Sequence, residues 1–467
     1  MDTTVQRLRY VLEVLAPAVA GKKVTLPILQ NIVVGQGKAY ATNLKIAITV
    51  EMPEATDDPV VLPHRQVLSL LRQVPGPTRL TLNLEGAVIK LAAGATSAKF
   101  PVLGEVADFP PLFELQPIGE GQVDGDLFLK IATALVEYAA TEASRPVLQC
   151  VCITLGAPLE MAGADGFRLA WRTTPMALPV PTAALKQLLL PAAAVHALAR
   201  AWKVMEKQPT MDAPDGADPL KQDASSWLAM SAVAKRMATI RFTPTVLSFH
   251  HGAVTTQVQL TQGEYPNYHQ LIPTDLPNKV SFDAEEALRA IKSLAEVAAG
   301  NEGIVRLKWA GGRLVFAASA DEAGSLTTSI SGHTLDREGK IAFNIRYLTE
   351  YLERKKGLVL METSTPSAPG RFFHSGSPDV LLMPIYVQWE GSPVGRRPAD
   401  QPADEAPPES QKSPPGDTPL DPEGALPPFD AEDVEFGPPA TNGAEEPAPV
   451  TAKPRARARR SKSRTAS

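Results

Sequence analysis

Apolar residues recur along the chain in two patterns, one typical of helices and one typical of strands. Val5, Leu8 and Leu12 begin a stripe at helical spacing, which predicts a helix over Thr4–Ala20. Alternating stretches follow it and predict the strands Thr25–Val34, Lys38–Thr42 and Lys45–Glu51. A second helix is predicted to open at Pro63, and three more strands over Thr78–Leu84, Ala87–Ala93 and Ser97–Val102.

The same order of helix, strands, helix and strands occurs three times. In the second round Phe128 and Pro191 mark the two helices, and in the third round Leu288 and the capping residue Asn344 mark them. The spacing of the rounds is roughly 120 residues, which indicates a repeat architecture. We therefore expect an α+β fold of three similar domains.

Two segments depart from this order. Residues 206–232 are rich in Asp, Pro and Gly and interrupt the second round as an inserted surface loop. From about Gly391 onward Pro, Ala, Glu and Asp dominate, a composition that predicts a disordered acidic tail with a basic end. The predicted domains are accordingly 1–118, 119–273, 274–390 and the tail 391–467.

Composition excludes several classes of protein. Met1-Asp2-Thr3-Thr4 begins no signal peptide and no apolar run has membrane-spanning length, so we expect neither feature. Cys150 and Cys152 are the only cysteines, so we expect no disulfide framework. Both would face one side of a strand over Leu148–Thr154, where small buried side chains are expected rather than a redox pair. The sequence has no Walker loop, nucleophile elbow, HExxH or His/Cys cluster, so we expect no catalytic residue, no metal and no cofactor.

The net charge of −5 is weak evidence about nucleic acid, because binding depends on where the charges lie. A hairpin over Ala162–Ala170, with Asp165-Gly166 as its turn, belongs to a series of six short motifs in a fixed order. The series consists of Thr25-Leu26-Pro27-Ile28-Leu29-Gln30-Asn31, Ala107-Asp108-Phe109-Pro110, Ala164–Ala170, Tyr265-Pro266-Asn267-Tyr268, Phe343-Asn344-Ile345-Arg346-Tyr347-Leu348 and Leu381-Leu382-Met383-Pro384-Ile385. In this series the chain resembles the bacterial DNA polymerase III beta subunit, the DNA sliding clamp, from about Thr4 to Val387.

The resemblance implies a head-to-tail homodimer closed into a ring around double-stranded DNA, with helices on the inner face and antiparallel sheets outside. It implies a non-catalytic processivity factor of the cytoplasm, associated with the nucleoid. Its partners would be the replicative DNA polymerase and clamp loader subunits. A clamp paralogue that binds partners without encircling DNA is the alternative, and the oligomeric state distinguishes the two.

The resemblance also implies a hydrophobic cleft that binds short peptides of partner proteins. The positions that match it are Leu148, Gly166, Phe167, Arg168, Leu169, Pro266, Leu271, Asn344, Tyr347, Met383, Pro384 and Ile385. Arg168 would receive a peptide carboxylate or carbonyl. Phe167 stands where the family usually has His, and Gln270 where Arg is common. Ala298-Ala299 replace larger residues that support the contact between subunits.

Helices that line a hole around DNA should carry basic side chains on their non-core faces. We expect DNA contacts from Arg7, Lys23, Arg72, Arg145, Arg200, Lys203, Arg289 and Lys292. A separate hypothesis concerns the tail, which has apolar positions at Leu426–Phe429 and Val434–Phe436. Through them the tail would fold back onto the cleft or recruit another protein.

Overall fold

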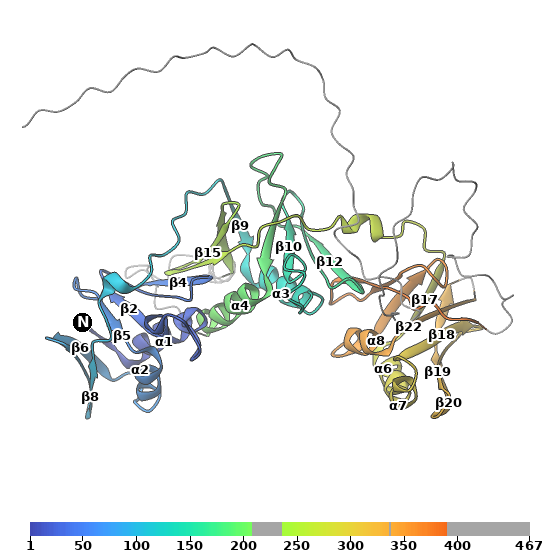
Figure 1. The fold of residues 1–467 in the computed structure, drawn as a ribbon, viewed down its shortest axis with the longest axis horizontal. Helices are drawn as coiled ribbons and strands as arrows, with labels where there is room; N and C mark the ends of the chain where they lie inside the picture. The colour runs from blue at the N-terminus through green and yellow to red at the C-terminus, as the bar shows by residue number, and fades with distance from the viewer. Residues whose placement is uncertain (208–235, 336–337, 390–467) are drawn as a thin grey trace, which may run out of the picture. The chain divides into compact units, whose positions relative to one another are not determined.

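The structure is a computed structural model, and it describes residues 1–207, 236–335 and 338–389 (Figure 1). Residues 208–232 of the predicted insertion and the whole predicted tail, 391–467, lie outside the described residues. Among the described helices, none has the length and apolarity that crossing a bilayer requires.

One order of elements, strand, helix, three strands, strand, helix and three strands, occurs three times. The first unit comprises β1 (Asp2–Thr4), α1 (Val5–Leu15), β2 (Ile32–Gly35), β3 (Lys38–Thr42), β4 (Ile46–Glu51), β5 (Val60–Leu62), α2 (His64–Leu71), β6 (Arg79–Glu85), β7 (Val88–Ala93) and β8 (Thr96–Pro101). The second comprises β9 (Gly119–Asp124), α3 (Gly125–Val136), β10 (Cys150–Thr154), β11 (Leu159–Ala164), β12 (Arg168–Thr174), β13 (Gln187–Pro191), α4 (Ala192–Glu206), β14 (Met237–Phe242), β15 (Val246–His251) and β16 (Val254–Gln259).

The third unit keeps this order and adds a short helix and a short strand. It comprises β17 (Asn278–Asp283), α6 (Ala284–Ser293), α7 (Ala295–Ala299), β18 (Ile304–Ala310), β19 (Arg313–Ala320), β20 (Gly324–Ser331), β21 (His333–Leu335), β22 (Gly339–Asn344), α8 (Ile345–Leu352), β23 (Leu358–Thr363), β24 (Gly370–Phe373) and β25 (Asp379–Leu382). The predicted α+β class with antiparallel sheets is confirmed.

Strand pairing joins neighbouring units. The β4 strand of the first unit pairs with β16 of the second, which gives an eight-stranded sheet in the order β5-β2-β3-β4-β16-β15-β14-β9. The β12 strand of the second unit pairs with β25 of the third, within a nine-stranded sheet. Within the described residues two four-stranded sheets remain, β1-β6-β7-β8 and β20-β19-β18-β22.

The helices bury their apolar stripes against these sheets. Val5, Leu8 and Leu12 of α1 are fully buried, and Thr4 caps this helix because its hydroxyl accepts a hydrogen bond from Arg7 N at 3.2 Å. Within each unit the two long helices contact each other: α1 with α2, α3 with α4, and α6 with α8. Such packing leaves the opposite helix faces to solvent, where the charged residues lie.

Prolines account for several differences from the predicted elements. The helix predicted over Thr4–Ala20 ends at Leu15 and continues as a 3₁₀ turn, Ala16–Ala18, because Pro17 cannot donate a backbone hydrogen bond. Pro27–Gln30 is likewise a 3₁₀ turn, so only the end of the predicted strand Thr25–Val34 is extended. Pro63 and Pro191 occupy the N-cap rather than the first helical position.

The prediction for the two cysteines is confirmed. Cys150 and Cys152 are free and buried on one side of β10, with relative exposures of 0% and 1%. The Cys150 thiol lies 3.1 Å from the Thr261 hydroxyl, and burial raises the pKa of Cys152 to about 12. A thiol with so high a pKa is a poor nucleophile, in keeping with a structural role.

Candidate functional site

A narrow apolar pocket lies beside the tip of the β11–β12 hairpin. Its empty space is about 330 Å³, but the centre of a water molecule can occupy only about 20 Å³ of it. The lining residues are Leu148, Ala164, Gly166, Arg168, Leu169, Tyr265, Pro266, Tyr268, Leu271 and Met383. Side chains of this kind form a site for apolar anchors of a ligand, and a bulky anchor would have to displace part of the lining.

Local hydrogen bonds determine the shape of the hairpin tip. Asp165 Oδ1 accepts hydrogen bonds from the backbone N–H groups of Phe167 and Arg168 at 2.9 and 3.0 Å. Gly166 has a φ of +95°, a backbone conformation that residues with a Cβ atom rarely adopt. Because Ala164 pairs with Leu169, the turn spans residues 165–168 rather than Asp165-Gly166 alone.

The hairpin brings the end of the third unit to the pocket. The β12 strand pairs with β25 from Arg168–Leu382 to Trp171–Asp379. Just past this ladder, Met383 N donates to Phe167 O at 2.9 Å. Met383 therefore completes a pocket whose other lining residues come from earlier parts of the chain.

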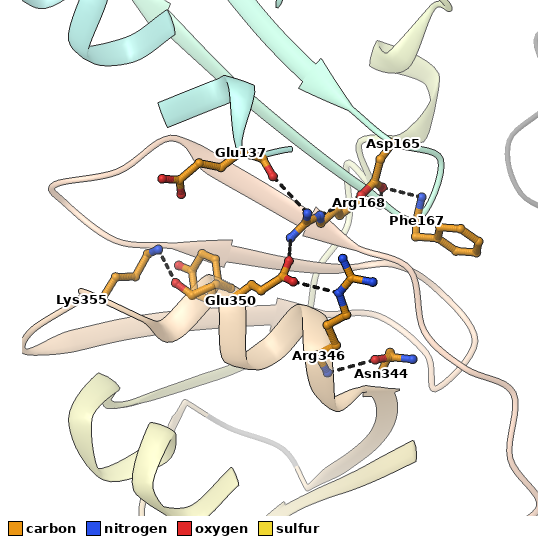
Figure 2. Close-up of polar contacts among 9 residues, drawn as sticks. Glu137, Asp165, Phe167, Arg168, Asn344, Arg346, Glu350 and Lys355 are labelled. Atoms are coloured by element: carbon orange, nitrogen blue, oxygen red, sulfur yellow. Dashed lines mark hydrogen bonds and ion pairs between the residues drawn. The ribbon is translucent and has the colours of Figure 1, made fainter. Parts of the chain in front are cut away.

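The Arg168 side chain is occupied by partners within the chain, as Figure 2 shows. Its Nε donates to Asp165 Oδ2 at 2.8 Å, Nη2 donates to Glu137 O at 3.0 Å, and Nη1 forms an ion pair with Glu350. The guanidinium also lies 5.2 Å from the centre of the Tyr138 ring and 5.1 Å from that of Tyr347. The side chain is only 10% exposed, so partners within the chain hold its guanidinium in this structure, and its expected contact with a peptide carboxylate stays a prediction.

Glu350 on α8 links this arginine to a second one. Its Oε1 accepts a hydrogen bond from Arg346 Nε at 2.8 Å. Burial raises the pKa of Glu350, but the hydrogen bond from Arg346 and the charge of Arg168 outweigh burial and lower it below its usual value. The cluster therefore joins α8 of the third unit to the β11–β12 hairpin of the second.

Seven of the twelve predicted cleft residues line the pocket, namely Leu148, Gly166, Arg168, Leu169, Pro266, Leu271 and Met383. Phe167 and Tyr347 stack on each other outside it, with ring centres 5.9 Å apart. Asn344 caps α8 by accepting from Arg346 N at 2.9 Å. Pro384 is buried next to Met383, and Ile385 N donates to Ala342 O at 2.8 Å.

Sequence reasoning missed Ala164, Tyr265 and Tyr268 as lining residues. Both tyrosines belong to the motif Tyr265-Pro266-Asn267-Tyr268, so the sequence already pointed to them. The hydroxyl of Tyr268 donates a hydrogen bond to Glu160, which fixes the position of the tyrosine ring. The same carboxylate lies 3.1 Å from His269 Nε2.

Ala298 is one of the two alanines that stand where the family has larger residues. It is fully buried within its own unit, so its side chain cannot support a contact between subunits.

The predicted DNA-contacting cations fall into several groups. Arg7, Arg72 and Lys292 are paired with Glu54, Glu13 and Glu353, and Arg7 also donates to Glu51 O at 2.9 Å. Arg200 and Lys203 are exposed on one side of α4 and form no ion pair with a described carboxylate. Arg289 lines a shallow groove between α6 and β20, and Arg145 is half-buried before β10.

Lys23 lies in a large groove where the first and second units meet. The groove measures about 900 Å³ and is lined by five segments, 19–24, 43–46, 140–150, 191–194 and 259–261. Its charged lining residues in the described part of the chain are Lys23 and Lys45. The groove is therefore positively charged, a property that favours anionic ligands.

Comparisons with known proteins agree with this fold. Residues 269–363 match the family model "DNA polymerase III beta subunit, C-terminal domain". The beta sliding clamp of Caulobacter vibrioides is 23% identical over 384 residues, which are 79% of this chain and 92% of that protein. The beta sliding clamp of Synechococcus elongatus is 25% identical over 298 residues, which are 63% and 72% of the two chains.

Solved structures extend the similarity to nearly a whole clamp chain. The match to the Pseudomonas aeruginosa sliding clamp has a TM-score of 0.70 at 17% identity. It covers 83% of this chain and 99% of that clamp chain. The Thermotoga maritima beta subunit gives a TM-score of 0.68 at 18% identity, with the same shares covered. In the family model, in the curated relatives and in its fold, this chain is therefore similar to the DNA polymerase III beta subunits, the bacterial sliding clamps.

Proposed function

We propose that this chain is a DNA sliding clamp, which closes into a ring with a second copy and encircles double-stranded DNA. The observation that carries the proposal is the way in which strands join the three units. The proposed domains are 1–118, 119–273 and 274–390, one for each repeat of the element order. The clamp itself would catalyse no reaction.

Each internal junction uses equivalent strands. The fourth strand of one unit pairs antiparallel with the last strand of the next unit, as β4 does with β16 and β12 with β25. The corresponding strands that remain are β20 of the third unit and β8 of the first, and both are sheet edges. Since unpaired edges of this length recruit other strands, we propose that β20 pairs with β8 of another copy.

The arrangement of charges supports duplex DNA as the encircled molecule. Lys23 in the groove and Arg200 and Lys203 on α4 are cations that can meet phosphates without reading sequence. We assign Arg289 to the contact between copies, because it lies beside the β20 edge. Sequence-independent contacts of this kind are weak and sensitive to salt, which permits sliding.

The apolar pocket is the proposed site for peptides of the replicative polymerase, of clamp loader subunits and of other DNA-processing proteins. A few buried anchors carry most of the affinity in such sites. A solved Pseudomonas aeruginosa clamp is bound to griselimycin, which supplies a probe. Calorimetry should detect griselimycin binding here, and Met383→Asp should weaken it at least about tenfold because a carboxylate would enter the apolar lining.

Leu358→Asp is the matched control for this experiment, because Leu358 is 66% exposed and does not line the pocket. It should leave griselimycin binding unchanged. Equal affinity of the Met383 variant and the parent would place the ligand elsewhere and contradict the proposed pocket.

Absolute mass by light scattering over a dilution series tests the ring. A mass near twice 49.9 kDa that persists on dilution supports a closed dimer. A monomer at every concentration contradicts the self-assembled ring and would leave a partner-binding adaptor as the function.

A further inference from the structure

The outer face of the four-stranded sheet in the third unit is basic. In β18 and β22 the side chains of Val305, Leu307 and Ile341 are buried toward the helices, so their neighbours along each strand point to the other face. The strand register brings together on that face Arg306, Lys308, Arg313 and Lys340. Within the described part of the chain none of these four cations forms an ion pair with a carboxylate.

Two of these cations are a directly opposed pair. Lys308 and Lys340 are register partners on neighbouring strands. Like charges at opposed positions destabilise a sheet. The Trp389 ring partly compensates, because its centre lies 5.6 Å from Lys308 Nζ and 5.1 Å from Lys340 Nζ. The ring carries no net charge, so the four positive charges remain unneutralised by described residues.

The described chain ends on this face. After β25 the backbone passes the edge strand β22, where Ile385 N donates to Ala342 O at 2.8 Å, and it reaches Trp389. The next acidic stretch, Asp400–Glu423, contains seven Asp or Glu residues and one Lys, and it begins eleven residues after Trp389. An eleven-residue chain without regular structure would have an end-to-end distance of about 17–20 Å, which would give the stretch an effective concentration of about millimolar near the face.

We propose that Asp400–Glu423 of this chain docks on the basic face formed by Arg306, Lys308, Arg313 and Lys340, beside Trp389. Opposite charges and the short connection together favour this segment over a separate partner. The docked stretch would neutralise the like-charge pair and keep DNA phosphates from binding the outside of the molecule. This inference does not depend on ring formation or on the pocket.

Carbodiimide cross-linking of the full chain tests the contact, because it joins a lysine amine to an adjacent carboxylate with loss of water. Peptide mapping should find Lys308 or Lys340 joined to carboxylates of 400–423, and 1 M salt should abolish these products. The double variant Lys308→Gln/Lys340→Gln should lose them, whereas Lys186→Gln, an exposed lysine before β13, should not affect the yield of products from Lys308 and Lys340. Mixing ¹⁵N-labelled and unlabelled chains shows whether the joined residues belong to one chain.

A second measurement does not depend on cross-linking. We expect neutralisation of the seven acids to Asn and Gln to raise the affinity for a short linear duplex at least threefold at low salt, measured by fluorescence anisotropy. Adding Lys308→Gln/Lys340→Gln to that variant should cancel the gain, whereas adding Lys186→Gln should not. Cross-links only between chains, or tail cross-links confined to other lysines, would overturn the proposal. So would an unchanged affinity for DNA.

Discussion

At the scale of single residues, Arg168 connects two repeating units through one guanidinium group. It contacts Asp165 in its own hairpin, the carbonyl of Glu137 after α3, and Glu350 on α8 of the third unit. Removing a mostly buried arginine leaves carboxylates without their partner, and this costs more than the loss of an exposed pair.

Arg168→Ala should lower the free energy of unfolding by about 2–3 kcal/mol. Arg346→Ala is the matched control, because Arg346 contacts the same Glu350 but is 73% exposed, and its loss should cost less than about 1 kcal/mol. Urea unfolding followed by circular dichroism measures both. Equal losses for the two variants would contradict the structural role assigned to Arg168.

Glu350 gives stability a specific dependence on pH. Its pKa in the folded chain is lowered despite burial, by the hydrogen bond from Arg346 and the charge of Arg168, relative to an ordinary value of 4.5. A lowered carboxylate pKa contributes stability above the ordinary value, and that contribution disappears as the pH falls through the folded value. Glu350→Gln should therefore cost about 1 kcal/mol at pH 7 after solvent screening, since Glu350 is 35% exposed.

The difference between parent and Glu350→Gln should shrink as the pH falls below about 4.5. Urea midpoints at pH 7, 5 and 3.5 give the comparison. A difference that stays constant over this range would show that the carboxylate charge contributes nothing to folding.

At the scale of elements, β8 and β20 are edge strands with equivalents elsewhere in the chain that are paired. Along β20 successive N–H groups point alternately toward β19 and toward the free edge. Proline is tolerated in an edge strand only where its missing N–H would have faced outward.

Thr327 and Thr328 are successive residues of β20. One of the variants Thr327→Pro and Thr328→Pro therefore removes an N–H that points to the free edge (the outward variant), and the other removes an N–H that points to β19 (the inward variant). The outward variant should keep the thermal stability of a folded monomer and weaken association of copies at least tenfold, measured by analytical ultracentrifugation. The inward variant should lower thermal stability, because it breaks the β19–β20 ladder. Two stable dimeric variants would exclude β20 from the contact between copies.

At the scale of the whole molecule, the proposed ring holds DNA by topology rather than by affinity. Once loaded, it should remain on closed circular DNA in a gel-filtration run at about 0.5 M salt, because it cannot slide off. Linearising the DNA should release it, since phosphate contacts alone are screened at that salt concentration. Equal loss from circular and linear DNA would favour the adaptor.

The order of helices and strands, repeated three times, follows from local patterns in the amino-acid sequence. Apolar spacing in Val5, Leu8 and Leu12, and the motif Ala164–Ala170, are local properties of the chain. The short strands β5 and β13, which precede α2 and α4, were not predicted, because their three and five residues carry too little alternation to be recognised. The 3₁₀ turn at Pro27–Gln30 was missed for a related reason, since apolar residues there imitate a strand.

Which of the selected residues meet depends on how distant elements pack in the folded chain. It brought Met383 to Leu148 and Leu271, added Tyr265 and Tyr268 to the pocket, and took Phe167 and Tyr347 out of it. It also showed that Arg168 and Arg7 are engaged within the chain, which a list of basic residues cannot reveal. The physical reason is that spacing determines the face of an element on which a side chain lies, whereas its partners depend on how distant elements pack.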